Sequence, residues 1–255
     1  MKNSNTIGKY ITIFLLLAFT SSAFADAKSS GQNALHPVAR ADLRYEYENL
    51  KEGGDEHQAI FRLEEKLDIN EGVKVALRAD LPTVFVDEEE SSSGLGDSLF
   101  QALVIRKTSK RWRHACGLRT IVPTATEDET GKGKWDLAPV IGTSVDLPEL
   151  GHGSFSSLLL RYRFSVLGES ERRDVNQLEF DLDINLHLEN RWFAEITSDA
   201  VLNFNAGDRW AVPIGLEVGK RVGKSLIFSV EPQYFLVRDS TNVQFLVESR
   251  VGVFF

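Results

Sequence analysis

Residues 178–188 read Leu-Glu-Phe-Asp-Leu-Asp-Ile-Asn-Leu-His-Leu, and this stretch decides the fold class. Every second residue is apolar, from Leu178 through Phe180 and Leu182 to Leu188, and acidic or polar residues stand between them. A period of two sorts these residues onto two faces only if the chain is extended, because a helix would scatter both sets around its circumference. The stretch therefore predicts a β-strand with one apolar and one polar face.

The same alternation recurs along the chain, and turn-forming residues divide it into about twelve segments. Alternation is less regular in two of these segments, 97–106 and 113–122, since Phe100, Val104 and Ile105 do not alternate cleanly. The predicted strands lie near 39–49, 58–69, 72–81, 97–106, 113–122, 135–146, 155–166, 176–188, 191–202, 209–219, 225–237 and 243–255.

Composition excludes several other classes of protein. The 255 residues are 42% hydrophobic and 26% charged, which argues against a disordered or collagen-like chain. The single cysteine, Cys116, cannot close an intrachain disulfide or supply a cysteine-rich zinc site. No segment after the N-terminus approaches 18 consecutive apolar residues, so helical membrane spans are not expected.

The N-terminus has the features of a secretory signal. Lys2 and Lys9 accompany an apolar run over 11–19, which is too short to span a bilayer, and Ala23-Phe24-Ala25 then provides a cleavage site. We expect residues 1–25 to be removed, leaving a single barrel domain over 26–255. Cleavage would leave the chain even more acidic than its net charge of −8, which argues against a nucleic-acid partner.

Alternation alone does not say which face points inward. A soluble barrel or sandwich buries its apolar face, whereas an outer-membrane barrel turns it toward lipid. The outer-membrane interpretation is favoured by Phe255, a terminal aromatic that resembles an assembly signal for such barrels. It is also favoured by aromatic residues at predicted strand ends, where the two membrane interfaces would lie. These residues include Trp112, Trp135, Trp192, Trp210, Tyr45, Tyr47, Tyr162, Phe164, Tyr234 and Phe235.

Connection lengths support the same choice. Predicted turns on one side are mostly short, whereas those on the other, such as 82–96 and 123–134, are mostly longer and charged. An even strand number leaves both termini on one side, as in bacterial barrels. We therefore predict an all-β, membrane-spanning, antiparallel up-and-down β-barrel in the bacterial outer membrane. Its expected partners are the lipid bilayer and the barrel-assembly machinery, which would engage the C-terminal strand.

In this topology the polar faces would line a lumen with charges of both signs. Such charges can set ion selectivity along a water path. They can equally form a salt-bridged plug, since barrels of modest strand number are filled by side chains. Both possibilities stay open. The expected lumen residues are Arg62, Glu64, Arg78, Arg161, Arg163, Glu179, Asp181, Asp183, Glu248 and Arg250.

Short motifs next to the predicted strands carry a family resemblance. Gly94-Leu-Gly-Asp97 precedes one strand, Pro123-Thr-Ala-Thr126 follows the next, and Gly131-Lys-Gly-Lys-Trp135 leads to Pro139. Over about residues 72–255 the chain resembles the outer-membrane barrel family named for the meta-pathway of phenol degradation, although Ala125 stands where the family often has glycine. The resemblance implies a narrow channel or transporter for small organic solutes, aromatic ones among them. The alternative is a closed structural or interaction barrel without transport.

No residue pattern makes a strong case for catalysis. His152 and Ser154 resemble the His-x-Ser pair of an outer-membrane lipid A deacylase, but a nucleophile needs an oriented base. A hydrogen-bonded lumen residue is the expected role of His187. The acidic run Asp87–Glu90 is expected to be a solvated loop, since it lacks the glycine-bent ligand spacing of a calcium site. We therefore expect no enzyme activity, no metal and no cofactor.

Overall fold

A computed structural model of the protein describes residues 33–51, 53–87 and 91–255. The expected signal peptide at 1–25 and the acidic residues 88–90 lie outside these ranges. Four single-turn 3-10 helices, all in connections, are the only helices in the described ranges: η1 (Asp128–Thr130), η2 (Pro148–Leu150), η3 (Glu189–Arg191) and η4 (Phe204–Ala206). Within these ranges, no helix has the length and apolar character needed to cross a membrane.

Thirteen strands make up a single sheet in the described residues. They are β1 (Arg40–Leu50), β2 (Asp55–Asn70), β3 (Val73–Asp87), β4 (Ser92–Leu95), β5 (Ser98–Lys107), β6 (Trp112–Val122), β7 (Lys134–Asp146), β8 (Phe155–Gly168), β9 (Asn176–His187), β10 (Trp192–Asn203), β11 (Arg209–Val222), β12 (Leu226–Arg238) and β13 (Val243–Phe254).

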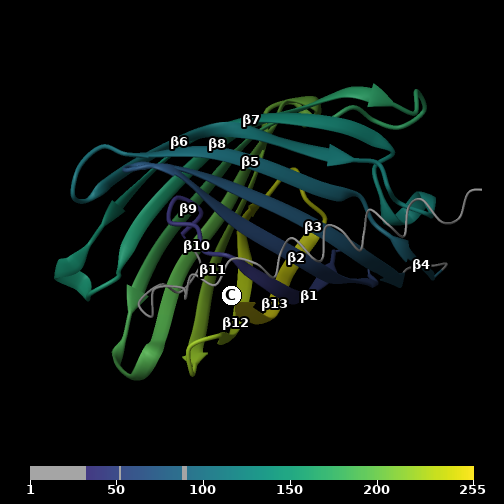
Figure 1. The fold of residues 1–255 in the computed structure, drawn as a ribbon. Coiled ribbons are helices and arrows are strands. Elements are labelled where there is room, and N and C mark those ends of the chain that lie inside the picture. Colours follow the sequence, from purple (N-terminus) through teal and green to yellow (C-terminus); the bar gives the residue numbers. More distant parts are fainter. Residues whose placement is uncertain (1–32, 52, 88–90) are drawn as a thin grey trace, which may run out of the picture.

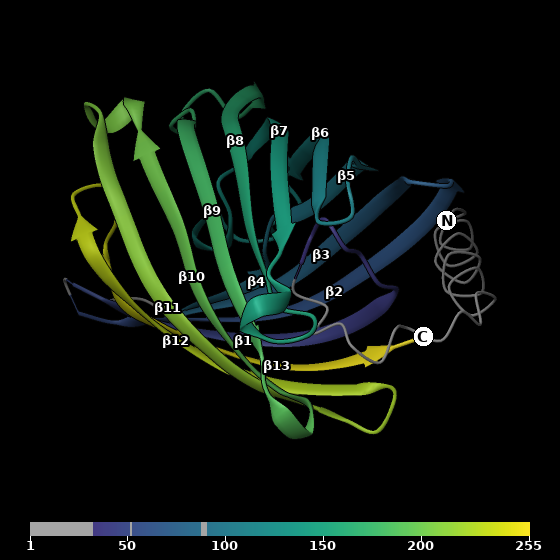
Figure 2. The same cartoon turned by 90° about the vertical axis from the view of Figure 1, so that its left-hand side faces the viewer.

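The sheet closes into a barrel (Figures 1 and 2). Each long strand pairs with its neighbours in sequence, all antiparallel, and β1 pairs with β13 from Arg40↔Phe254 to Leu50↔Val243. Closure gives every long strand a partner on both sides, which removes the open edges of a flat sheet. We call the end where β1 begins and β13 finishes the inner end, and the opposite end the outer end. The predicted twelve-strand antiparallel barrel is confirmed.

The extra strand, β4, was not predicted. Residues 82–96 were expected to be an outer loop, but β3 continues to Asp87 and β4 pairs with its outer part, from Thr83↔Leu95 to Val86↔Ser92. The inner part of β3 pairs with β5. Thus β4 and β5 share one position in the barrel wall, interrupted at Gly96 and Asp97, and the barrel keeps twelve positions.

The apolar faces point outward. Leu182 is 42% exposed and Ile141 59% exposed, and all four tryptophans are exposed on the outside near strand ends. An apolar belt with aromatic residues at its rims is what a lipid-facing barrel requires. One aromatic prediction is wrong: Phe235 points inward and lines the lumen, because its position on β12 has the same parity as Glu231.

The segment just before β1 lies inside the barrel at its inner end. Leu35 is 1% exposed and packs against inward side chains that include Leu103 and Ile105 of β5, and Asn33 Nδ2 donates to Ser144 Oγ at 2.8 Å. Burying one leucine contributes about 1.5–3 kcal/mol. This contact explains why β5 does not alternate: its inner face is apolar because it receives this segment.

Candidate functional site: a charged lumen

Inward side chains surround a cavity of about 680 Å³. Seven arginines, Lys132 and eleven carboxylates line it, together with a smaller set of apolar residues. The charges come from strands all around the barrel, because each strand turns alternate residues inward. The lumen is therefore predominantly ionic.

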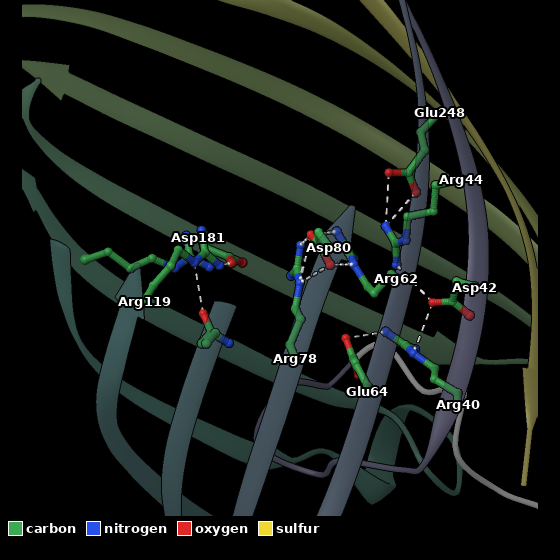
Figure 3. Close-up of polar contacts among 12 residues, drawn as sticks. Arg40, Asp42, Arg44, Arg62, Glu64, Arg78, Asp80, Arg119, Asp181 and Glu248 are labelled. Atoms are coloured by element: carbon green, nitrogen blue, oxygen red, sulfur yellow. Dashed lines mark hydrogen bonds and ion pairs between the residues drawn. The ribbon is translucent and has the colours of Figure 1, made fainter. Parts of the chain in front are cut away.

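Arginines on β1, β2 and β3 form the first charged network (Figure 3). Asp80 accepts from Arg62 Nε at 2.8 Å and from Arg78 Nη2 at 2.5 Å, so one carboxylate holds two guanidinium groups. Arg40 pairs with Glu64 at 2.9 Å and with a buried Asp42 at 3.1 Å. Charge-assisted pairs of this kind fix the side chains against the wall.

A further contact of this network joins the two ends of the chain. Arg44 Nη1 of β1 pairs with Glu248 of β13 at 2.7 Å, and the two residues are 204 positions apart in the sequence. The contact exists because β1 and β13 are neighbours in the closed barrel. Figure 3 shows this pair beside Arg62 and Asp42.

Arginines on β6 and β8 form the second network. Arg161 pairs with Asp181, and Arg163 donates to Asp136 Oδ2 at 2.6 Å. Arg119 donates to the Gln101 side chain at 3.0 Å and lies 3.8 Å from Glu179. Every arginine that lines the cavity therefore has a carboxylate partner.

The opposite part of the wall is acidic. We call the following residues the acid wall: Asp183 of β9, Glu195 and Asp199 of β10, Glu217 of β11 and Glu231 of β12. Glu217 lies 3.6 Å from Arg250. The other four have no ion pair with lysine or arginine among the described residues. β10 and β3 lie six positions apart in the twelve-position ring, so the β10 part of this wall lies across the barrel from β3.

The family motifs form one junction at the outer end. Asp97 accepts backbone N–H bonds from Ala125 at 3.3 Å and Lys132 at 2.6 Å, and Thr124 Oγ1 accepts from Ser98 N at 2.9 Å. A side chain on Gly131 would meet Asp97 and the Ala125 methyl group. The three motifs thus form a clamp, in which Asp97 and Ser98 on one side hold the loop between β6 and β7 on the other.

This clamp places Lys132 so that its side chain lines the cavity. Removal from water lowers the pKa of the Lys132 ammonium group, and the nearby cation of Arg163 lowers it further. Lys132 belongs to the connection before β7, so it adds a cation at the outer end of the lumen.

Nine of the ten residues predicted for the lumen line the cavity: Arg62, Glu64, Arg78, Arg161, Arg163, Glu179, Asp181, Asp183 and Glu248. Arg250 is buried beside Glu217, outside the cavity lining. Phe255 follows β13, and its backbone N–H donates to Ala39 O at 3.2 Å. Sequence reasoning missed further lining charges, among them Arg40, Arg44, Glu46, Arg119, Glu195, Asp199, Glu217 and Glu231. Extending the inward parity to every strand would have found them.

The residues considered for catalysis, His152 and Ser154, do not line the cavity. Ser154 is buried; its hydroxyl donates to Leu150 O at 3.3 Å and accepts from His187 N at 3.0 Å, which ties it to the turn. His152 is exposed on that turn. Across the ranges that the structure describes, no group of three or more His, Cys, Asp or Glu residues is arranged to hold a metal ion.

A closed barrel with an outward apolar belt and a charged interior defines a membrane-spanning β-barrel protein. Residues 53–244 match the family described as "Putative MetA-pathway of phenol degradation", and the chain belongs to this family. A search among curated protein sequences finds no match.

Solved structures share the fold at low sequence identity. The structure is similar to an outer membrane channel from Pseudomonas putida F1, with a TM-score of 0.71 and 11% identity over 86% of this chain and 95% of that one. It is also similar to the KdgM porin, with a TM-score of 0.61 and 9% identity over 85% and 99% of the two chains. The NanC porin has a TM-score of 0.60 and 13% identity over 84% and 98%.

Proposed function

We propose that this protein is an outer-membrane channel through which small organic solutes, aromatic ones among them, diffuse. The observation that carries the proposal is the cavity of about 680 Å³ inside a barrel whose apolar side faces outward. A polar lumen in an apolar shell offers polar solutes a path that the hydrocarbon does not. The three solved structures named above are an outer membrane channel and two porins, which supports the same interpretation. Delivery by the barrel-assembly machinery, through the strand that ends near Phe255, is part of this proposal.

Support for aromatic solutes comes from an apolar patch within the lumen. We call Val201, Ala211, Pro213, Phe235 and Leu246 the apolar shelf; these residues line the cavity on β10 to β13. Val201 pairs with Ala211 and Pro213 with Phe235 in the ladder, so the shelf is continuous across neighbouring strands. An aromatic ring can stack on Phe235 and bury apolar area there.

Recording from purified, folded protein in planar lipid bilayers tests this function. We expect discrete conductance steps and solute-dependent swelling of liposomes that contain the protein. A silent barrel, both for the intact chain and for a variant lacking residues 33–38, would contradict the proposal.

A closed barrel is the second candidate, and one observation favours it. Leu35 is buried at the inner end of the lumen, where it packs on an apolar cluster that includes Leu103 and Leu159. If the variant lacking residues 33–38 conducts and the intact chain does not, the intact chain is a closed barrel at rest.

A further inference from the structure

The carboxylates of the acid wall are held mainly by neutral donors. Ser157 Oγ donates to Asp183 at 3.0 Å, Asn185 Nδ2 to Glu195 at 2.9 Å, and Gln233 Nε2 to Glu231 at 3.0 Å, where Thr197 Oγ1 donates as well. A neutral donor orients a carboxylate without cancelling its charge. The acid wall therefore presents oriented negative charge to the cavity.

The rest of the lumen does not cancel that charge. The lining arginines are each already paired with a carboxylate, as described above, and the carboxylates that line the cavity outnumber its lysine and arginine residues. Asp199 is exposed within the cavity, so its charge can reach a solute directly. A cleft lined by one sign of charge raises the local concentration of the opposite ion.

One buried amide oxygen beside the acid wall, in the part of the chain that the structure describes, accepts no hydrogen bond. Asn185 is fully buried beside Glu195, to which it donates through Nδ2, and its Oδ1 has no hydrogen-bond partner within the described residues. A buried acceptor without a donor is costly. Asn185 does not itself line the cavity, so a cation in the lumen would meet the carboxylate of Glu195, which this amide holds in place.

The apolar shelf lies immediately above the acid wall, toward the outer end. On β10 Val201 follows Asp199 by two residues, which corresponds to about 7 Å along a strand. On β12 Phe235 follows Glu231 by four residues. A short alkyl chain between an aromatic ring and an amine spans a similar length. The two surfaces can therefore engage the two ends of one small molecule.

We propose that the lumen selects amphipathic organic cations, with the apolar body on the shelf formed by Val201, Pro213 and Phe235 and the ammonium group on Glu195, Asp199 and Glu231. This inference rests on the proposed channel function and adds the chemical class of its solute. Aromatic and alkyl amines fit it, and aromatic carboxylates do not, because they would meet the acid wall with like charge.

Two measurements on the purified protein in planar bilayers test the inference. The reversal potential in a potassium chloride gradient should show preference for potassium over chloride. 2-Phenylethylamine should reduce the potassium current at lower concentration than phenylacetate, which carries the same ring with the opposite charge. The combined variant Glu195→Gln, Asp199→Asn and Glu231→Gln should lower both the cation preference and the amine sensitivity by about tenfold.

A matched control removes three carboxylates outside the lumen, with Glu71→Gln, Glu171→Gln and Glu189→Gln, and should leave both values unchanged. If the triple lumen variant does not fold, Asp199→Asn alone, at a position exposed to the cavity, should shift both values in the same direction. A conducting barrel that prefers chloride, or that responds equally to amine and carboxylate, overturns the inference and leaves the channel standing. A barrel that stays silent with or without residues 33–38 overturns both.

Discussion

At the scale of single residues, Asp80 has the most consequential position in the first arginine network. It is 6% exposed and holds Arg62 and Arg78 together. Burying charges is costly, and the cost is recovered only while the partners remain in place. Removing this carboxylate would leave two guanidinium groups close to each other with no shared anion.

We predict that Asp80→Asn lowers the free energy of unfolding by about 3–5 kcal/mol, because it leaves uncompensated buried charge. Urea unfolding in detergent micelles measures this change. Asp68→Asn is the control: Asp68 also contacts two cations, Lys66 and Lys74, but its side chain is 59% exposed. We expect that change to cost at most about 1 kcal/mol. Equal effects of the two variants would contradict the role given to burial.

How far these pairs are predictable depends on sequence distance. Arg62 and Asp80 lie on strands joined by a short turn, so their pairing follows from the hairpin register. The Arg44–Glu248 pair does not follow from any local pattern, because it requires the closure of β1 on β13. Parity alone placed Arg62 and Asp183 in the lumen, but it could not say that one is paired with a carboxylate and the other is held by a serine.

At the scale of elements, the strands were predictable and their interruptions were not. The strand near 176–188 was predicted within a residue of β9 because its two faces differ so strongly. β4 was missed, because Ser92–Leu95 lacks alternation and pairs only through the extended end of β3. The apolar residues of β5 looked irregular from sequence because their partner, Leu35, lies outside any strand.

The segment before β1 gives a prediction about conductance. We expect Leu35→Ser to weaken the docking of this segment by about 2–5 kcal/mol, the range for truncating a buried leucine. The inner end of the lumen would then open more often, and single-channel conductance would rise. Leu150→Ser, at an exposed leucine in the connection to β8, is the control and should not change it. An unchanged conductance in Leu35→Ser would show that the segment does not limit flow.

The clamp at the outer end gives a prediction about the loop between β6 and β7. Asp97→Ala removes the acceptor of two backbone N–H groups, so the loop should open locally more often. We expect faster trypsin cleavage at Lys132 and Lys134 in the folded barrel. Glu171→Ala, in the next outer connection, should leave the cleavage rate at wild-type level. If Asp97→Ala is as resistant as the unaltered protein, the clamp does not hold the loop.

At the scale of the whole molecule, the account depends on one arrangement: apolar side chains face lipid and charged side chains face an aqueous lumen. β10 shows it in two consecutive residues. Ile196 is 44% exposed on the outside, and Thr197 lines the cavity and donates to Glu231. The one cysteine, Cys116, is exposed on β6. A Cys116→Ser variant removes this thiol, so that a cysteine introduced at position 196 or 197 is the only thiol that can react.

The most direct test places that thiol at each position in turn and applies a charged, membrane-impermeant thiol reagent during bilayer recording. We predict that Thr197→Cys reacts and that its conductance falls, because the added group occupies the lumen. Ile196→Cys, facing hydrocarbon, should stay unmodified until detergent or denaturant exposes it. Rapid modification of Ile196→Cys together with an inert Thr197→Cys would contradict the account.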